Sequence, residues 1–414
     1  MCGANKLNFI GLLTQLCFLF QTNLIISCQN EYEVVNTKLG PVKGIKTKFN
    51  DKSVSQFFGI PYAVPPLEEL RFARPIRLTT PWKDVKDVTK PKAACMQKPH
   101  PSLNVNKDVT PLNSLKQAKL MARDLDCEEE WLKCLKKVET LKILNWVIKN
   151  KSFYPLYTNS TDGFLPLNSS FPKAFESGNF KKDVELLIGT VANEGSAYLK
   201  NEIPLYFNRE NQRLIDKPLA KKLVSEMFNY SNIESDLIAD FYISHIYHEE
   251  RNELRKGVAY AFGDFRIVCP VYYFSKNVAH YSQISRVFSF QFTFKPTIGL
   301  AKNCVDWMGV CHADDIVFTF GVPLRHPQNY SVEDYYFSLL IINVWTSFVK
   351  TGNPAPSHYY GISPFQSKHI EWPQFRLKKD IAPNYMILHP KHFGNVIYYP
   401  YHNNCEGLWG KYFL

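Results

Sequence analysis

The chain has 414 residues, enough for one large hydrophobic core or for two domains. Hydrophobic residues make up 45% of the sequence and charged residues 21%, which excludes an intrinsically disordered chain and favours a globular one. The net charge of +11 would suit a nucleic-acid or anionic-surface partner. However, the lysines and arginines are scattered, and aromatic residues do not interleave with them as in a single-strand groove, so we predict no nucleic-acid partner.

Residues 1–28 have the pattern of a secretory signal peptide. Lys6 gives a basic start, Ile10–Phe20 forms the apolar core, and cleavage is expected near Ser27 or Cys28. The apolar core is too short to span a bilayer as a helix, although an uncleaved anchor is the alternative interpretation. Because no second long apolar run follows, we predict a secreted or lumenal protein without a transmembrane span. Five N-x-S/T sequons fit a secretory route: Asn150, Asn159, Asn168, Asn229 and Asn329.

The first part of the mature chain predicts strands and then helices. Tyr32–Thr37 and Val42–Lys48 are predicted strands around a turn at Gly40, and Val54–Ile60 is a third. Apolar residues at helical spacing then predict three amphipathic helices: Ser114–Leu125, Glu129–Lys136 and Val138–Lys149.

Two further strands are predicted at Leu186–Val191 and Arg286–Phe294. The first is a short, almost continuously apolar run, which is typical of a buried parallel strand in an α/β fold. Asn329–Phe348 predicts a long helix with Ser331 as its N-cap, and Gly352 follows as a stop signal. Helical stretches are also predicted between the two strands: Pro218–Asn229, Glu234–His245 and Glu249–Ser282.

One carboxylate directly follows the strand at Leu186–Val191. Glu194 lies in a polar, turn-prone loop, at the carboxyl end of what we expect to be a central strand. Open α/β sheets bind their ligands at this end of their strands. A glutamate after a strand is most often a solvated loop residue, so position alone leaves both interpretations open.

Four segments of the sequence carry recognisable motifs: Phe58–Pro66 (FGIPYAVPP), Glu176–Leu199, Trp307–Asp315 (WMGVCHADD) and Phe318–Leu324 (FTFGVPL). Together they resemble the type-B carboxylesterases and cholinesterases, which have the α/β-hydrolase fold. The first segment is similar to the N-terminal region of that family, the second to the segment that carries its catalytic acid, and the last two to its histidine loop. The resemblance implies a single domain over residues 29–414, with a mostly parallel central sheet flanked by helices.

The resemblance implies that Glu194 is the acid of a catalytic triad and that His312 is its base. The two residues occur in the chain order of α/β-hydrolases, but no G-x-S-x-G nucleophile elbow and no His-Gly-Gly oxyanion loop is present. Ser196 is no substitute, because Glu194 stands where the elbow needs a glycine. Asp314 and Asp315 are adjacent, so we interpret them as loop or cap residues and not as a carboxylate pair.

The missing motifs belong to one block of the family pattern. Between Cys95 and Ser114 the family normally carries on the order of 150 further residues, a domain's worth of chain. That block holds several central strands, the oxyanion loop and the serine. We therefore predict an incomplete α/β-hydrolase fold that is catalytically inactive and prone to aggregation, because its sheet has an unpaired edge.

The cysteines are interpreted as structural disulfides. The resemblance implies the pairs Cys127–Cys134 and Cys269–Cys405, and it leaves Cys95 without the partner that the family places in the missing block. Cys304 and Cys311 are close enough in sequence to pair with each other. The cysteine spacing matches no CxxC-type zinc site, and we predict neither a metal nor a cofactor.

Three hypotheses about function follow. The first is an inactive product of an esterase gene that lost an internal segment, by splicing or through an incomplete gene model, and whose full-length parent hydrolyses small carboxylic esters. A dimer through the C-terminal helices is a further expectation. The second is a deliberately non-catalytic member that acts in adhesion or ligand binding. The third is a hydrolase with Cys95 or Cys311 as nucleophile, which we disfavour because Cys311 and His312 are neighbours on an extended loop and point opposite ways.

Overall fold

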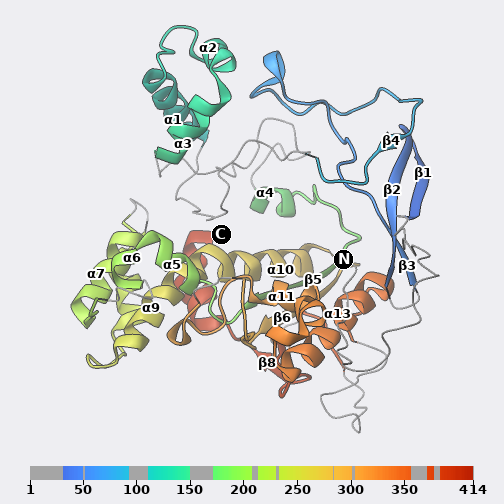
Figure 1. Cartoon of the computed structure of the whole chain (residues 1–414). Coiled ribbons are helices and arrows are strands. Elements are labelled where there is room, and N and C mark those ends of the chain that lie inside the picture. Colours follow the sequence, from blue (N-terminus) through green and yellow to red (C-terminus); the bar gives the residue numbers. More distant parts are fainter. Residues whose placement is uncertain are drawn as a thin grey trace, which may run out of the picture. The chain divides into compact units, whose positions relative to one another are not determined.

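The structure is a computed structural model, and the residues that it describes form two compact units. One unit comprises the described residues among 1–99 and 119–146, and the other comprises the described residues among 100–118 and 147–414 (Figure 1). The predicted signal peptide, Cys95, Asn150, Asn159 and Asn168 lie outside the described residues. None of the helices in the described part of the chain combines the length and the apolar character needed to cross a bilayer. The described residues are 31–49, 52–92, 111–149, 171–207, 213–229, 233–282, 284–300, 304–355, 371–376 and 383–413.

The first unit contains a small sheet of four strands. Its strands are β1 (Glu31–Thr37), β2 (Gly40–Phe49), β3 (Lys52–Gln56) and β4 (Lys86–Asp87). The first three pair antiparallel in chain order, and β4 lies parallel to β2. The predicted third strand was placed too late in the sequence. Because Phe49 pairs with Lys52, β3 begins directly after the turn, and beyond Gln56 the N–H of Phe58 bonds to the Val88 carbonyl oxygen instead.

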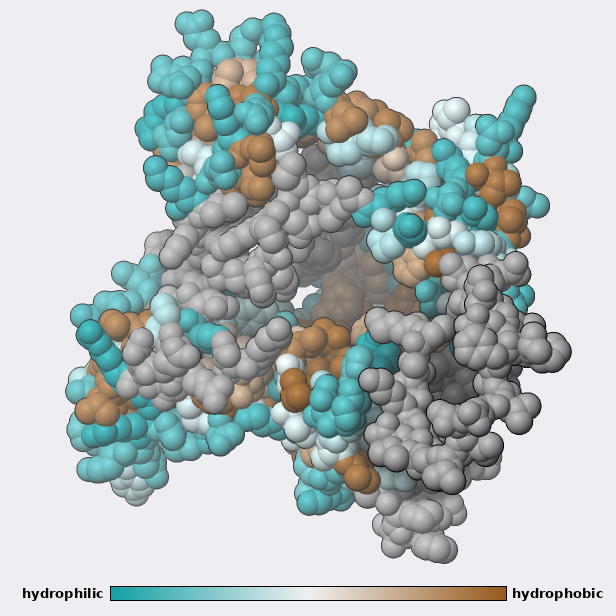
Figure 2. Space-filling view, viewed as in Figure 1, coloured by the Kyte–Doolittle hydropathy of each residue, from teal (hydrophilic) through white to brown (hydrophobic). Residues whose placement is uncertain are grey.

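Large hydrophobic side chains on this sheet are left exposed. Tyr32, Val34 and Val54 expose 52%, 54% and 47% of their surface, and hydrophobic atoms are visible over β1–β4 in Figure 2. Exposed apolar side chains that gather in one place typically mark a surface that is covered by another element or partner.

Three helices follow in the sequence, as predicted, and the first unit includes the second of them and parts of the other two. They are α1 (Pro111–Asp124), α2 (Trp131–Lys137) and α3 (Thr140–Lys149). A disulfide joins Cys127 to Cys134 at the start of α2. The Arg71 guanidinium donates to the Leu135 and Val138 carbonyl oxygens at the end of α2 and to the Thr140 hydroxyl. A cation in this position satisfies carbonyls that have no partner within the helix.

The second unit is built on a mixed, mostly parallel sheet. Its strands are β5 (Glu185–Val191), β6 (Arg286–Phe292), β7 (Asn384–Leu388) and β8 (Val396–Tyr398), in that spatial order. The first three are parallel, and β8 is antiparallel to β7. Within the described residues β5 is therefore an edge strand, whereas the sequence led us to expect a central one.

Helices enclose this sheet and create two hydrophobic cores. The larger core includes Leu199, Phe207 and Trp409. The smaller core lies where β6 and β7 meet the helices α11 and α13, whose bounds are given below. In the smaller core the ring of Phe337 lies 5.0 Å from Phe318. The helices are α4 (Phe171–Glu176), α5 (Ser196–Glu202), α6 (Pro204–Phe207), α7 (Lys217–Met227), α8 (Ser235–Ile243), α9 (Arg251–Gly263), α10 (Cys269–Tyr281), α11 (Asp314–Thr319), α12 (Val322–Arg325), α13 (Val332–Thr351) and α14 (Gly410–Phe413).

The long helical stretch predicted at residues 249–282 is interrupted. A π-helical turn at Asp264–Val268 separates α9 from α10. Pro270 at the start of α10 has no N–H to donate, which removes one bond of a regular helix. The Asp264 side chain at this turn is buried, and its carboxylate accepts bonds from the Tyr242 hydroxyl at 2.6 Å and from the Asn404 amide at 2.8 Å. A disulfide between Cys269 and Cys405 ties the start of α10 to the C-terminal segment.

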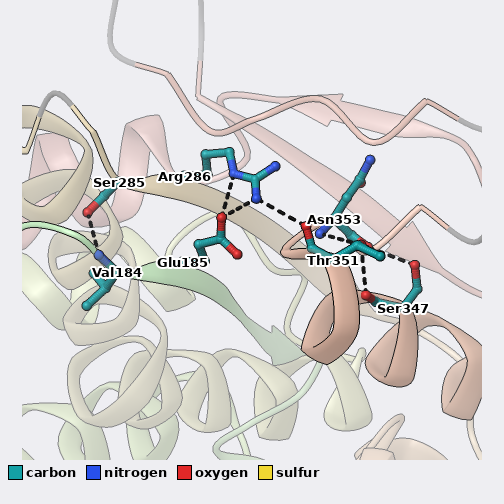
Figure 3. Close-up of polar contacts among 7 residues, drawn as sticks. All are labelled: Val184, Glu185, Ser285, Arg286, Ser347, Thr351 and Asn353. Atoms are coloured by element: carbon teal, nitrogen blue, oxygen red, sulfur yellow. Dashed lines mark hydrogen bonds and ion pairs between the residues drawn. The ribbon is translucent and has the colours of Figure 1, made fainter.

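Polar contacts fix α13 against the first residues of β5 and β6 (Figure 3). The Arg286 guanidinium forms an ion pair with Glu185 and also donates to the Thr351 carbonyl oxygen at 3.2 Å. Gly352 ends the helix with a φ of +66°, and a Cβ there would overlap the Glu185 carboxylate. Ser331 caps the other end, as predicted, and forms a reciprocal capping box with Asp334. The two ends of α13 are therefore set by specific contacts.

Candidate active site

Glu194 lies in a tight loop between β5 and α5. Its side chain is buried, with 6% of its surface exposed. The loop packs against α9 at Gly195, where a Cβ would overlap the Ala259 carbonyl oxygen and lie 2.7 Å from the Gly263 nitrogen. Only glycine permits so close an approach of two backbones, so this residue holds the loop against α9.

One carboxylate oxygen of Glu194 accepts a hydrogen bond from the last residue of β5, on the edge that faces away from β6. The N–H of Ala192 bonds to the Phe292 carbonyl oxygen of β6 at 2.9 Å, so the N–H of Val191 points away from β6. Glu194 Oε1 accepts that N–H at 2.8 Å. This bond fixes the carboxylate and leaves its other oxygen for a second partner.

That second partner is His312. Its Nδ1 lies 2.6 Å from Glu194 Oε2, although the two residues are 118 positions apart in the sequence. The imidazole is partly accessible, with 37% of its side chain exposed. A carboxylate bonded to Nδ1 orients the ring and fixes its tautomer, which leaves Nε2 as the nitrogen that can accept a proton.

The loop that carries His312 is held by Asn193, the neighbour of Glu194. Asn193 Oδ1 accepts the Val310 N–H at 2.8 Å, and its own N–H donates to the Val310 carbonyl oxygen at 3.2 Å. Its Nδ2 donates to the Tyr260 hydroxyl at 3.0 Å. The acid loop and the histidine loop are thus joined next to both functional side chains. A disulfide between Cys304 and Cys311 closes the histidine loop on the other side.

Burial and charge act in opposite directions on His312. Burial disfavours the charged imidazolium and lowers its pKa, but the hydrogen bond to Glu194 and that carboxylate's charge raise it, with smaller contributions from Asp315 and Asp314. The net result is a pKa above the ordinary value of 6.5. The Tyr198 ring lies 5.0 Å from the imidazole ring, and burial together with the charge of Glu194 raises the pKa of its hydroxyl.

The two aspartates after His312 begin α11. Asp314 is only 1% exposed, and its Oδ2 accepts the Cys311 N–H at 2.8 Å. Burial raises the pKa of Asp314 to about 6. Burial and the negative charge of Glu194 raise the pKa of Asp315. Ala313 lies between His312 and Asp314 with a φ of +73°, in the left-handed region that non-glycine residues rarely adopt.

Within the described residues, neither neighbouring hydroxyl nor thiol is placed as a nucleophile. The Ser196 hydroxyl donates to the Asn193 carbonyl oxygen at 2.9 Å and is 2% exposed. Cys311 is bound in a disulfide, and its side chain is fully buried. The site therefore presents an imidazole that is oriented by a buried carboxylate.

Two of the predicted glycosylation residues lie within the described ranges. Asn229 and Asn329 are both exposed, which is compatible with modification. Sequence reasoning did not identify Asn193 or Tyr198 as part of the site. No local signal distinguishes them, because their partners lie on a loop more than a hundred residues later.

Comparison with known proteins identifies the family of the chain. Residues 31–110 and 102–399 match the carboxylesterase family. The chain is 30% identical over 259 residues to an acetylcholinesterase of Bungarus fasciatus, an alignment that covers 59% of this chain and 41% of the relative. The chain thus spans well under two thirds of the length of that curated relative. Since the family match extends over most of the sequence, the chain belongs to the carboxylesterase family.

Proposed function

We propose that Glu194 and His312 are the acid and base of a serine carboxylesterase triad, and that this chain, as its sequence stands, does not hydrolyse esters. The observation that carries the proposal is the 2.6 Å contact between His312 Nδ1 and Glu194 Oε2. In this mechanism the histidine takes a proton from a serine through Nε2, while the acid holds the ring in place. The sequence has no nucleophile elbow to supply that serine.

In this proposal the active parent acts on small carboxylic esters, and this chain lacks an internal segment that the parent has. Two observations support this part of the proposal. The family match is divided into two segments that meet at residues 102–110, inside the region where the family motifs are absent. The alignment with the acetylcholinesterase covers only 41% of that relative. A parent with the intact segment would supply the serine, the backbone donors for the oxyanion and the partner strand of β5.

The activity test uses the purified chain and a reactive phosphonate ester that labels serine hydrolases. We expect no labelling, and hydrolysis of a small aromatic acetate at the rate measured for the His312→Ala variant. Labelling that is lost in His312→Ala would show that the chain contains a working nucleophile. The Cys311→Ala variant tests whether the nucleophile is a cysteine thiol. It should abolish any labelling only if Cys311 is that nucleophile.

The origin of the chain is tested on its transcript. Sequencing across the codons for Cys95 to Ser114 should give a longer product that encodes His-Gly-Gly and Gly-x-Ser-x-Gly. A short product alone would mean a true deletion. It would favour the alternative function, a non-catalytic adhesion or ligand-binding protein, which a saturable partner of the purified chain would then establish.

We also propose that the protein is secreted and glycosylated. The described residues contain three disulfides, which form and persist in oxidising compartments. The exposed positions of Asn229 and Asn329 support glycan attachment. Enzymatic removal of N-glycans should increase the electrophoretic mobility of the protein recovered from culture medium. Sedimentation of the full-length parent tests the proposed dimer through its C-terminal helices.

A further inference from the structure

A cluster of possible metal ligands lies next to the Glu194–His312 pair but shares no atom with it. The Sγ atoms of Cys304 and Cys311 and a carboxylate oxygen of Asp314 all lie within 4.8 Å of one another. In the structure the two sulfurs form a disulfide. Sequence spacing alone predicted no metal site, because the third group comes from the first turn of α11 and not from a CxxC-type motif.

The Asp314 carboxylate is buried without a full set of partners. The residue is 1% exposed, and Oδ2 accepts the Cys311 N–H at 2.8 Å. Oδ1 has no hydrogen-bond partner among the described residues. A buried carboxylate oxygen without a partner is costly, which fits the rise of the Asp314 pKa to about 6 that burial produces.

A small cavity opens beside this carboxylate. It has a volume of about 190 Å³, and its lining includes Lys295, Gly299, Cys304 and Asp314. This volume is sufficient for an ion with one bound water. Gly299 lies so close to Asp314 that a Cβ there would overlap Oδ1, so this wall of the cavity is backbone.

We propose that the thiol-reduced form of this loop binds one zinc-class divalent cation through Cys304 Sγ, Cys311 Sγ and the Asp314 carboxylate. A water in the cavity supplies the fourth ligand. Tetrahedral zinc with bonds of about 2.3 Å to sulfur and about 2.1 Å to oxygen places its ligand atoms roughly 3.5–3.8 Å apart. The three atoms already lie within 4.8 Å, so side-chain rotation is sufficient once the sulfurs separate.

The chemistry balances with a small-molecule thiol as reductant. Two equivalents of that thiol transfer two electrons and two protons to the disulfide, giving two cysteine thiols and the oxidised thiol. The cation then displaces the two thiol protons as it binds the thiolates. The ligand set carries three negative charges, and the positive charge of Lys295, which opposes the rise of the Asp314 pKa, also lines the cavity.

The chain contains a matched control for this site. Cys127 and Cys134 form a disulfide with the same sequence separation of 7 residues. Within the described residues, however, the Cys304–Cys311–Asp314 group is the cluster whose ligand atoms could hold an ion. A pair of cysteines at this spacing is therefore not enough to predict metal binding, and the Asp314 carboxylate distinguishes the proposed site from the control.

The test uses Co²⁺ as the probe, because thiolate ligands give it a charge-transfer band in the near ultraviolet. The full chain is titrated before and after treatment with a phosphine reductant, and far-ultraviolet circular dichroism checks that each sample is folded. We expect one equivalent of Co²⁺ with the band in the reduced chain and none in the oxidised chain. The band should be retained in the Cys127→Ser/Cys134→Ser variant and lost in Cys304→Ser/Cys311→Ser.

The aspartate variants distinguish a built site from adventitious thiol binding. Asp314→Asn should weaken Co²⁺ binding at least tenfold, whereas Asp315→Asn should bind as the parent chain does. Equal binding by Asp314→Asn, a band that persists in Cys304→Ser/Cys311→Ser, or equal binding by the oxidised chain would each overturn the proposal. A reduced chain that is unfolded and binds no better than the double cysteine variant would also overturn it.

Discussion

His312 is held between two opposing effects, and Glu194 decides the outcome. Burial alone would lower the pKa of the imidazole, but the adjacent carboxylate raises it above 6.5. The same carboxylate is anchored by the Val191 N–H at 2.8 Å. An acid that is fixed at both oxygens orients its base without having to be reorganised, which is the arrangement that proton transfer requires.

Replacing Glu194 should therefore lower the pKa of His312. In Glu194→Gln the charge is removed while the size of the side chain is kept, so burial dominates and the pKa falls below that of the parent chain. A nuclear magnetic resonance titration of the His312 ring protons measures the change. Glu185→Gln, at the other end of β5, is the control and should leave the titration unchanged. An unaltered His312 titration in Glu194→Gln would contradict the assigned interaction.

The pair should also make stability depend on pH. Because the folded-state pKa of His312 is raised, its stabilising contribution is fully present below about pH 6.5, the unfolded value, and is lost as pH rises through the folded pKa. Urea denaturation from pH 5 to 9 measures this. We expect a smaller fall in stability over this range for Glu194→Gln than for the parent chain.

Asn193 should be essential for the position of the histidine loop. Asn193→Ala removes the acceptor of the Val310 N–H and leaves that buried donor unpaired, which costs about 1–3 kcal/mol. Urea denaturation should show this loss, and hydrogen exchange should show faster exchange of the Val310 amide. Asn329→Ala, at an exposed position, should change neither measurement.

Pattern and periodicity predict most elements, but not how they end. The strand Leu186–Val191 and the helix capped by Ser331 were predicted from local sequence and are confirmed. The break at Asp264–Val268 was not predicted, and the buried contacts of Asp264 at this break join it to Tyr242 and Asn404, which are distant in sequence. Helical periodicity continues through such a turn, so the sequence pattern does not register it.

The C-terminus of α13 should tolerate no side chain at Gly352. Its φ of +66° costs an alanine about 1–2 kcal/mol, whereas the overlap with Glu185 and Arg286 involves the ends of two flexible side chains that can move aside. Gly352→Ala should therefore lower the free energy of unfolding by about 1–2 kcal/mol in urea denaturation. Gly407→Ala is the control, since the nearest atom to its Cβ would lie 3.5 Å away. Equal effects of the two substitutions would contradict this account of the helix end.

At the scale of the molecule, the family motifs predicted what local rules could not. No periodicity places Glu194 beside a histidine 118 residues later, yet the structure does so at 2.6 Å. The motifs did not predict the roles of Asn193 and Gly195, which depend on contacts with the histidine loop and α9. Nor did they predict the buried ligand set at Asp314, because burial depends on the folded loop around it.

The unpaired edge of β5 should dominate the solution behaviour of this chain. Within the described residues β5 has β6 as its neighbour on one side, and its alternate N–H groups point away from β6. Of these, the Val191 N–H is satisfied by Glu194, which leaves the preceding part of the edge open to another strand. Parallel sheets are normally covered and paired, so an open edge in one favours association between chains.

We therefore expect low recovery from culture medium and concentration-dependent association of the purified chain. Size-exclusion chromatography at several protein concentrations measures the association, and thermal denaturation should give a broad transition. A relative of the same family with a complete nucleophile elbow serves as the control and should remain of constant size. If this chain elutes as one species at every concentration and melts cooperatively, then the β5 edge must be covered, and the sheet would have to be regarded as complete without the missing segment.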